Sequence, residues 1–198
     1  MKTIKNIVDP FDEVNYRDLP DGSRRVEASV AMERVFEGAK TGIAIDASAF
    51  FQGAPSDTFS PVAQKMCAYL ARKWGAEGST TVICWSSGIH GAHIEEVGEL
   101  TAEEAERYHF TGLEEEPHGT GTRLLLPLRY FVERPYFAEA KWGMYLFITA
   151  GTLDDLEGVK AYCLQLAKDI KARKRDGLKL VLLGLGPHVR EEQMAELA

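Results

Sequence analysis

Residues 42–48, Gly42-Ile43-Ala44-Ile45-Asp46-Ala47-Ser48, decide the fold. The stretch opens with an apolar run, which is typical of a buried strand. It ends on a carboxyl group and a hydroxyl group two residues apart, Asp46 and Ser48, where the chain leaves the strand. Oxygen ligands of this kind suit a hard divalent cation. The stretch therefore predicts a buried strand with a candidate metal site at its carboxyl end.

Three further apolar runs predict strands at 80–85, 143–149 and 178–185. The centres of these runs are apolar throughout, which predicts strands buried on both faces of a largely parallel sheet. Amphipathic helical patterns lie between the strands. The alternation predicts an α/β fold with three layers, a doubly wound Rossmann-like architecture with right-handed crossovers.

Local signals predict where the helices begin. One helix follows Thr122 and has an apolar face that includes Leu128 and Phe131. The others are preceded by residue types that cap helix N-termini or favour the first turn. These start signals are Ser60-Pro61, Thr101-x-x-Glu104 and Thr152-x-x-Asp155.

The chain is expected to divide into an N-terminal arm, residues 1–38, and a domain at 39–198. Residues 1–23 are rich in polar and turn residues, which predicts a loosely held arm. Apolar residues then alternate with polar or small ones from Val26 to Met32, the period of a half-buried strand. We expect an edge strand there.

The composition limits the function and the compartment. The 198 residues are 45% hydrophobic and carry a net charge of −7, which suits a globular domain and disfavours nucleic-acid binding. The three cysteines, Cys67, Cys84 and Cys163, lie in apolar segments and are expected to be buried thiols in a reducing compartment. No apolar run is long enough to cross a membrane and the first ten residues have no signal-peptide h-region, so the expected location is cytoplasmic.

Three segments together resemble the metal-ion-dependent adhesion site of von Willebrand factor A (vWA) domains. They are Asp46-Ala47-Ser48-Ala49-Phe50, Gly119-Thr120-Gly121-Thr122 and Phe147-Ile148-Thr149-Ala150-Gly151. Asp46, Ser48 and Thr122 match the family's ligand positions. Phe50 replaces a second serine of the first segment, and Ala150 replaces the aspartate of the third. The resemblance implies a degenerate site with no metal, or with Mg or Mn bound weakly.

The resemblance extends over about residues 40–195 and is similar in style to bacterial intracellular vWA proteins. These include the tellurium-resistance type and the type paired with MoxR-like AAA+ ATPases. The family has a further strand and helix beyond this point, so the resemblance implies that the chain lacks them and is a piece of a longer protein. It also implies an AAA+ ATPase as partner, in a bacterial stress or conflict assembly.

We therefore expect a non-catalytic protein–protein interaction module that uses the carboxyl-end rim of the sheet. Its expected partner-binding residues are Phe50, Phe51, His90 and His118. One alternative is a Mg- or Mn-dependent adaptor that works with a reduced ligand set, and another is a purely structural domain.

A third alternative is a hydrolase or phosphotransferase that uses Asp46, with Asp154, Asp155 or His118 as the second acid or base. Each carboxyl group also has a simpler interpretation. Asp46 would cap a loop by accepting backbone N–H groups. Asp154 and Asp155 would favour the first turn of the helix that follows them.

Overall fold

The computed structural model describes residues 2–3, 11–22, 24–30, 39–47, 56–75, 77–87, 93–110 and 122–197. The chain divides into two compact units, Met1–Val35 and Phe36–Ala198. This boundary lies close to the expected one at residue 38. Each unit has a sheet of its own.

The first unit is a small antiparallel sheet of order β1-β2-β3, formed by Lys2–Thr3, Phe11–Asp18 and Arg24–Val30. A tight turn joins β2 to β3, in which the N–H of Gly22 donates to the carbonyl of Leu19 at 3.1 Å. Gly22 has a φ of 82°, a conformation that favours glycine. The expected arm, residues 1–38, thus contains three strands, and β3 is an edge strand of this small sheet instead of the larger one.

The second unit is built on a five-stranded sheet of order β6-β5-β4-β7-β8. Strand β4 is central and parallel to both neighbours, β5 and β7, and β8 continues the parallel set. Only β6 runs antiparallel. The strands are β4 (Ala39–Asp46), β5 (Ser79–Ser87), β6 (His93–Thr101), β7 (Trp142–Thr149) and β8 (Gly177–Gly184).

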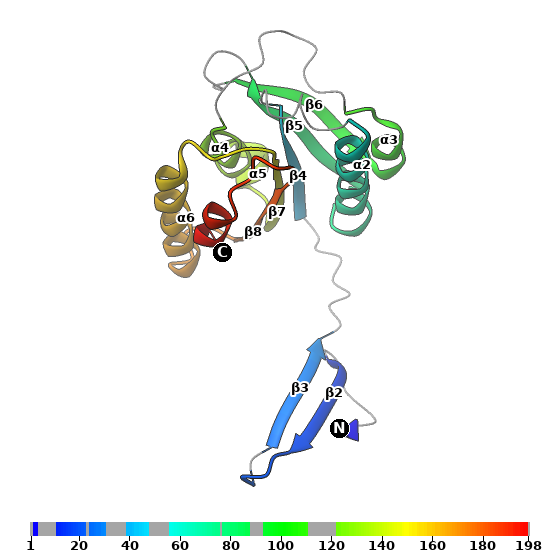
Figure 1. The fold of residues 1–198 in the computed structure, drawn as a ribbon, viewed down its shortest axis with the longest axis vertical. Helices are drawn as coiled ribbons and strands as arrows, with labels where there is room; N and C mark the ends of the chain where they lie inside the picture. Colours follow the sequence, from blue (N-terminus) through cyan, green and yellow to red (C-terminus); the bar gives the residue numbers. More distant parts are fainter. Residues whose placement is uncertain are drawn as a thin grey trace. The chain divides into compact units, whose positions relative to one another are not determined.

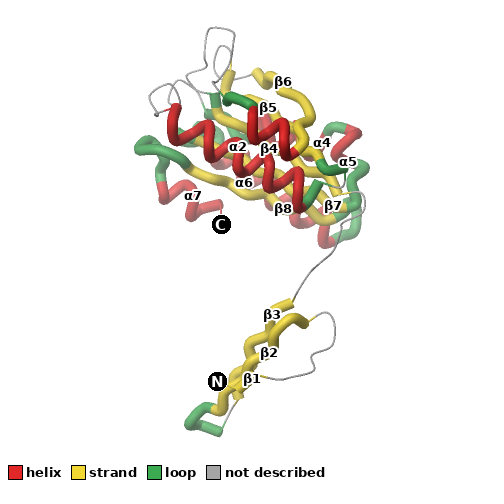
Figure 2. The backbone as a smooth tube through the Cα atoms, turned by 90° about the vertical axis from the view of Figure 1, so that its right-hand side faces the viewer, coloured by secondary structure: helices red, strands yellow, loops and turns green. Residues whose placement is uncertain are grey.

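Helices cover both faces of this sheet and give three layers (Figure 1). Helices α2 and α3 contribute to the core on one face, and α2 runs across that face in Figure 2. Helices α4, α5, α6 and α7 contribute to the core on the other face. Their bounds are α2 (Ser56–Lys73), α3 (Ala102–Arg107), α4 (Leu125–Glu133), α5 (Pro135–Ala138), α6 (Leu156–Lys171) and α7 (Glu191–Leu197).

The α/β class, the four predicted strands and the largely parallel sheet are confirmed. The capping box at Thr101 is confirmed as well, because Glu104 donates its N–H to the Thr101 hydroxyl and its carboxylate accepts the Thr101 N–H. Two other helix starts were wrong. Helix α2 begins at Ser56, so Pro61 lies inside it, and Ser60 accepts the N–H of Phe110 instead of capping α2. Thr152 donates to the carbonyl of His188 instead of capping α6.

The sequence patterns did not predict strand β6. Its apolar residues Ile94, Val97 and Leu100 are spaced by three. Val82 of β5 pairs with Gly98 and Ile83 pairs with Glu96, so Val97 is the extra residue of a bulge in β6. The φ of Gly98 is 123°, which only glycine adopts readily. The apolar residues of β6 therefore do not alternate with polar ones at a period of two. Both faces of the strand still pack on the core.

The expected burial of β8 on both faces was wrong. It is the last strand of the sheet on its side, and its residues are only partly buried. The cysteine expectation holds for Cys67 and Cys84, which are buried, whereas Cys163 is half-buried. Burial raises the pKa of the Cys84 thiol to about 12, and burial likewise raises the pKa of Cys67. These two thiols are therefore structural and unreactive.

A close contact between a strand and a helix positions the centre of the sheet. The Phe131 ring of α4 stacks on Tyr145 of β7, with ring centroids 5.0 Å apart and planes 2° from parallel. It lies against Gly42 of β4, where a Cβ atom would come within 2.3 Å of the ring. Glycine at this position lets the helix approach the central strand, and that approach brings the start of α4 to the carboxyl end of the sheet.

We therefore predict that Gly42→Ala destabilises the protein by about 1–3 kcal/mol, because the methyl group overpacks the core. Gly177→Ala is the matched control in another strand, where the nearest atom to a new Cβ is 3.8 Å away. Its effect is expected to stay within about 0.5 kcal/mol. Urea denaturation followed by circular dichroism measures both. Equal effects of the two substitutions would contradict the contact.

Candidate functional site

Asp46 lies at the carboxyl end of the central strand and is completely buried. In the sheet register it stands beside Trp85 of β5, and its neighbour Ile45 stands beside Ile148 of β7. In a parallel sheet this edge is where ligands bind. A buried carboxyl group is costly unless hydrogen bonds or an opposite charge compensate for the lost water.

The loop after β7 supplies such hydrogen bonds. The Thr149 hydroxyl donates to Oδ2 of Asp46 at 2.9 Å, and the backbone N–H of Ala150 donates to the same oxygen at 3.3 Å. Both residues are buried. The expectation that Asp46 caps a loop through a backbone amide agrees with this geometry. The carboxyl group therefore joins the ends of two neighbouring strands.

The same loop holds the segment that contains Thr122. Thr122 donates its N–H to Oδ2 of Asp154 at 3.1 Å, and Asp154 returns its own N–H to the Thr122 carbonyl at 2.9 Å. Asp155 accepts the N–H groups of Leu124 and Leu125 at 3.0 and 2.9 Å. Helix α4 begins here, so Asp155 caps it from a distant part of the chain.

We expected Asp154 and Asp155 to favour the first turn of α6, the helix that follows them. That expectation was therefore incomplete. Asp155 makes no side-chain cap bond within α6. Burial raises the pKa of its carboxyl group above the usual value, while the N–H bonds from Leu125 and Leu124 act to lower it. These bonds give both carboxyl groups a structural role in holding Thr122 and the start of α4.

Helix α7 is tied to the same loop. The Gln193 side chain accepts the N–H of Leu153 at 2.8 Å and donates to the Leu153 carbonyl at 3.0 Å. Leu185, just past β8, donates its N–H to the carbonyl of Thr149 at 2.8 Å. Residues 149–155 thus connect β4, the start of α4, β8 and α7, and we call them the rim loop.

Three polar groups near this edge are buried without a hydrogen-bond partner among the described residues. They are the Trp85 indole N–H, the Ser86 hydroxyl and the Thr122 hydroxyl. Each of these residues is at most 1% exposed. Ser86 also has a φ of 61°, an uncommon conformation for a residue other than glycine. Buried polar groups usually have a partner, and the Thr80 hydroxyl near the start of β5 also has none among the described residues.

Asp46 and Thr122 are the two predicted site residues that the structure describes, and the rim loop connects both. Ser48, Phe50, Phe51, His90 and His118 lie outside the described residues. Sequence reasoning missed the roles of Thr149, Trp85 and Ser86. The role of Thr149 could have been predicted from the sequence. Its hydroxyl lies at the end of a strand adjacent to Asp46 and can donate a hydrogen bond to the Asp46 carboxyl group. The strained backbone of Ser86 leaves no signal in the sequence.

The described residues do not fit a tightly held divalent cation. Asp46 offers one carboxyl group whose Oδ2 already accepts two donors, and Ala150 brings an N–H donor where a ligand oxygen would be needed. A cation of charge +2 favours several oxygen ligands and compensating negative charge. In the described part of the chain, no group of three or more His, Cys, Asp or Glu side chains is placed to hold a metal ion.

We predict that Asp155→Ala destabilises the protein by about 1–2 kcal/mol, because the first N–H groups of α4 lose their acceptor. Glu157→Ala is the control, since Glu157 is also an acid in the first turn of α6 but its side chain is 85% exposed. Its effect is expected to stay below about 0.5 kcal/mol. Thermal and urea unfolding measure both variants. If Glu157→Ala costs as much, the acids act through the helix dipole of α6 and not through α4.

Comparison of the sequence with models of known protein families gives no match, and comparison with curated proteins gives none either. Within the described residues, no helix has the length and apolar character needed to cross a membrane. The observations on the rim therefore come from the geometry of the chain itself.

Proposed function

We propose that residues 36–198 form a vWA-like, non-catalytic interaction module in which the carboxyl-end rim of the sheet contacts a partner protein without a strong metal requirement. The vWA assignment rests on the match of Asp46, Ser48 and Thr122 to the family's ligand positions and on the α/β order of the elements. A location in the bacterial cytoplasm and an AAA+ ATPase partner follow from the resemblance.

The observation that carries this proposal is the environment of Asp46. Its carboxyl group is fully buried and receives the Thr149 hydroxyl and the Ala150 amide. In the vWA family, an aspartate at the position of Ala150 would face a metal ion. Here the backbone N–H of Ala150 donates a hydrogen bond directly to the Asp46 carboxyl group. Hydrogen bonds within the protein thus order the rim in place of a metal ion.

The rim loop supports the proposal because hydrogen bonds between side chains and backbone groups hold the surrounding segments to it. Asp154, Asp155 and Gln193 each fix a neighbouring segment to it. A preordered surface loses less conformational entropy on binding than a flexible one. We assign partner contact to Phe50, Phe51, His90 and His118, with the two aromatic residues as apolar anchors.

The test is site-specific photo-crosslinking in the cells that contain the protein naturally. A photoreactive phenylalanine analogue replaces Phe51 in one variant and Leu164 in the control, since Leu164 lies on α6 with 64% of its surface exposed. We expect a crosslink at position 51 to an AAA+ ATPase, none at 164, and no change when EDTA removes divalent metal. Equal crosslinking at both positions would contradict a rim-specific partner.

A Mg- or Mn-dependent adaptor is the second candidate, and the Thr122 hydroxyl favours it. This group is 1% exposed and has no hydrogen-bond partner among the described residues. A metal-bound water or the ion itself would satisfy it. Asp46 and Thr122 would then be ligands together with Ser48, and several waters would complete the coordination of a weakly held ion.

Calorimetric titration of Mg and Mn into metal-stripped protein separates the two candidates. The leading proposal predicts no binding up to millimolar metal. It also predicts that Thr122→Val keeps or raises the stability, by up to about 1 kcal/mol, because an unsatisfied hydroxyl is removed. Binding that Asp46→Asn and Thr122→Val both abolish would establish the adaptor instead.

A variant that restores the family's ligands serves as the positive control for this titration. Phe50→Ser together with Ala150→Asp returns a hydroxyl and a carboxyl group to the rim. If the site is a degenerate adhesion site, this double variant gains Mg binding that the natural sequence lacks. If it folds and still binds no metal, the resemblance of the rim to the vWA site is not supported.

A further inference from the structure

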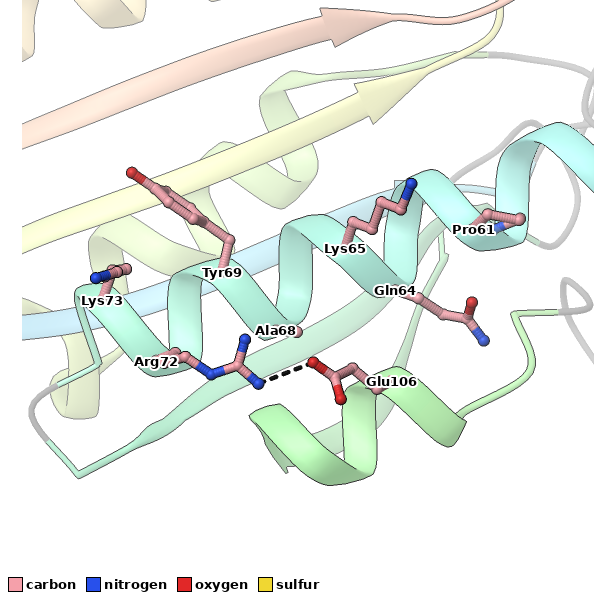
Figure 3. A pocket seen from close by; sticks show the side chains of 8 residues that line it. All are labelled: Pro61, Gln64, Lys65, Ala68, Tyr69, Arg72, Lys73 and Glu106. Carbon is pink, nitrogen blue, oxygen red and sulfur yellow. Dashed lines mark hydrogen bonds and ion pairs between the residues drawn. The ribbon is translucent and has the colours of Figure 1, made fainter.

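A groove of about 490 Å³ runs along the outer side of α2, where α3 packs beside it (Figure 3). Among the described residues, eight line the groove: seven belong to α2, from Pro61 to Lys73, and the eighth is Glu106 of α3. The α2 positions recur at intervals of three and four residues, so they form one stripe along the helix. Asp46 and Thr122 are not among the lining residues, so the groove is separate from the rim.

The groove has an apolar component. Ala68 is buried, and Tyr69 has 49% of its surface exposed. The Tyr69 ring projects from α2 between Lys65 and Lys73 in Figure 3. An exposed aromatic ring with a polar end is typical of protein interfaces, where it contributes a large contact area.

The charged residues of the groove are mainly cations, although the chain as a whole carries a net charge of −7. Glu106 is already bound to Arg72 through an ion pair of 2.8 Å. Lys65 and Lys73 make no ion pair with a residue that the structure describes. An acidic partner therefore finds complementary charge here.

We propose that this groove docks an acidic amphipathic helix of a partner protein. The stripe from Pro61 to Lys73 covers about 18 Å at 1.5 Å per residue, which matches about three turns of a docked helix. A helix presents apolar residues at intervals of three and four to such a groove, with acidic residues at its borders. An extended peptide would need a free sheet edge for backbone pairing, and the described residues that line this groove all lie on helices.

The probe is a synthetic fluorescent peptide of about four turns, with Leu and Phe on one face and Glu on the borders. A matched peptide carries Lys in place of every Glu. We expect the full-length protein to bind the acidic peptide and not the basic one in fluorescence anisotropy. Binding should weaken as NaCl rises from about 0.05 M to about 0.5 M, because salt screens exposed charges.

Two sets of variants locate the binding site. Lys65→Glu with Lys73→Glu should weaken binding about tenfold or more, since both cations lie beside the docked helix. Tyr69→Ser should weaken it through lost apolar contact. The matched control, Lys168→Glu with Lys171→Glu, makes the same charge change at the end of α6 and should leave binding nearly unchanged. Circular dichroism checks that all variants are folded.

Several outcomes would overturn the proposal. One is no binding of the acidic peptide, and another is binding that both double variants weaken equally. A third is a set of amide chemical-shift changes that lie away from α2 and α3. A fourth is a single-stranded oligonucleotide that binds as tightly as the peptide and competes with it, because the groove would then recognise phosphate. The peptide reports on the groove and the crosslink at position 51 reports on the rim, so failure at the rim and failure at the groove are distinguishable.

Discussion

The hydrogen bond from the Thr149 hydroxyl to the buried carboxyl group of Asp46 is the interaction on which the rim depends. It links the carboxyl ends of β4 and β7, the two strands at the middle of the sheet. From Thr149 the chain continues into the rim loop, whose next residues hold the start of α4 and the side chain of Gln193. A buried carboxyl group is costly without hydrogen-bond donors, so this pair of side chains helps to hold the two strand ends together.

The carboxyl groups around the rim loop hold it through hydrogen bonds within the protein. Asp46 accepts from β7 and its loop, Asp154 accepts from Thr122, and Asp155 accepts from α4. The groove along α2 differs from the rim, because it combines a half-exposed tyrosine with lysines that form no ion pair in the described part of the chain. The domain thus offers two surfaces of different chemistry.

Regular elements were predictable from the sequence where a local pattern agrees with the tertiary structure. The apolar runs gave β4, β5, β7 and β8, and Thr101 with Glu104 gave the start of α3. Strand β6 was missed because the irregular pairing near Gly98 changes its apolar spacing. The start of α2 was misplaced because Ser60 and Pro61 carry the signature of a helix start although they lie within the helix.

By itself, the sequence determined the α/β class and the position of Asp46 at the end of a buried strand, because both follow from hydrophobic patterns within a few residues. The tertiary structure alone decided which distant partners the polar side chains bind. Asp155 caps a helix that begins some thirty residues earlier in the chain, and Asp46 bonds Thr149 across 103 residues. The strained Ser86 and the groove between α2 and α3 likewise exist only in the fold. Such pairings depend on how strands and helices pack, and spacing along the chain carries no record of them.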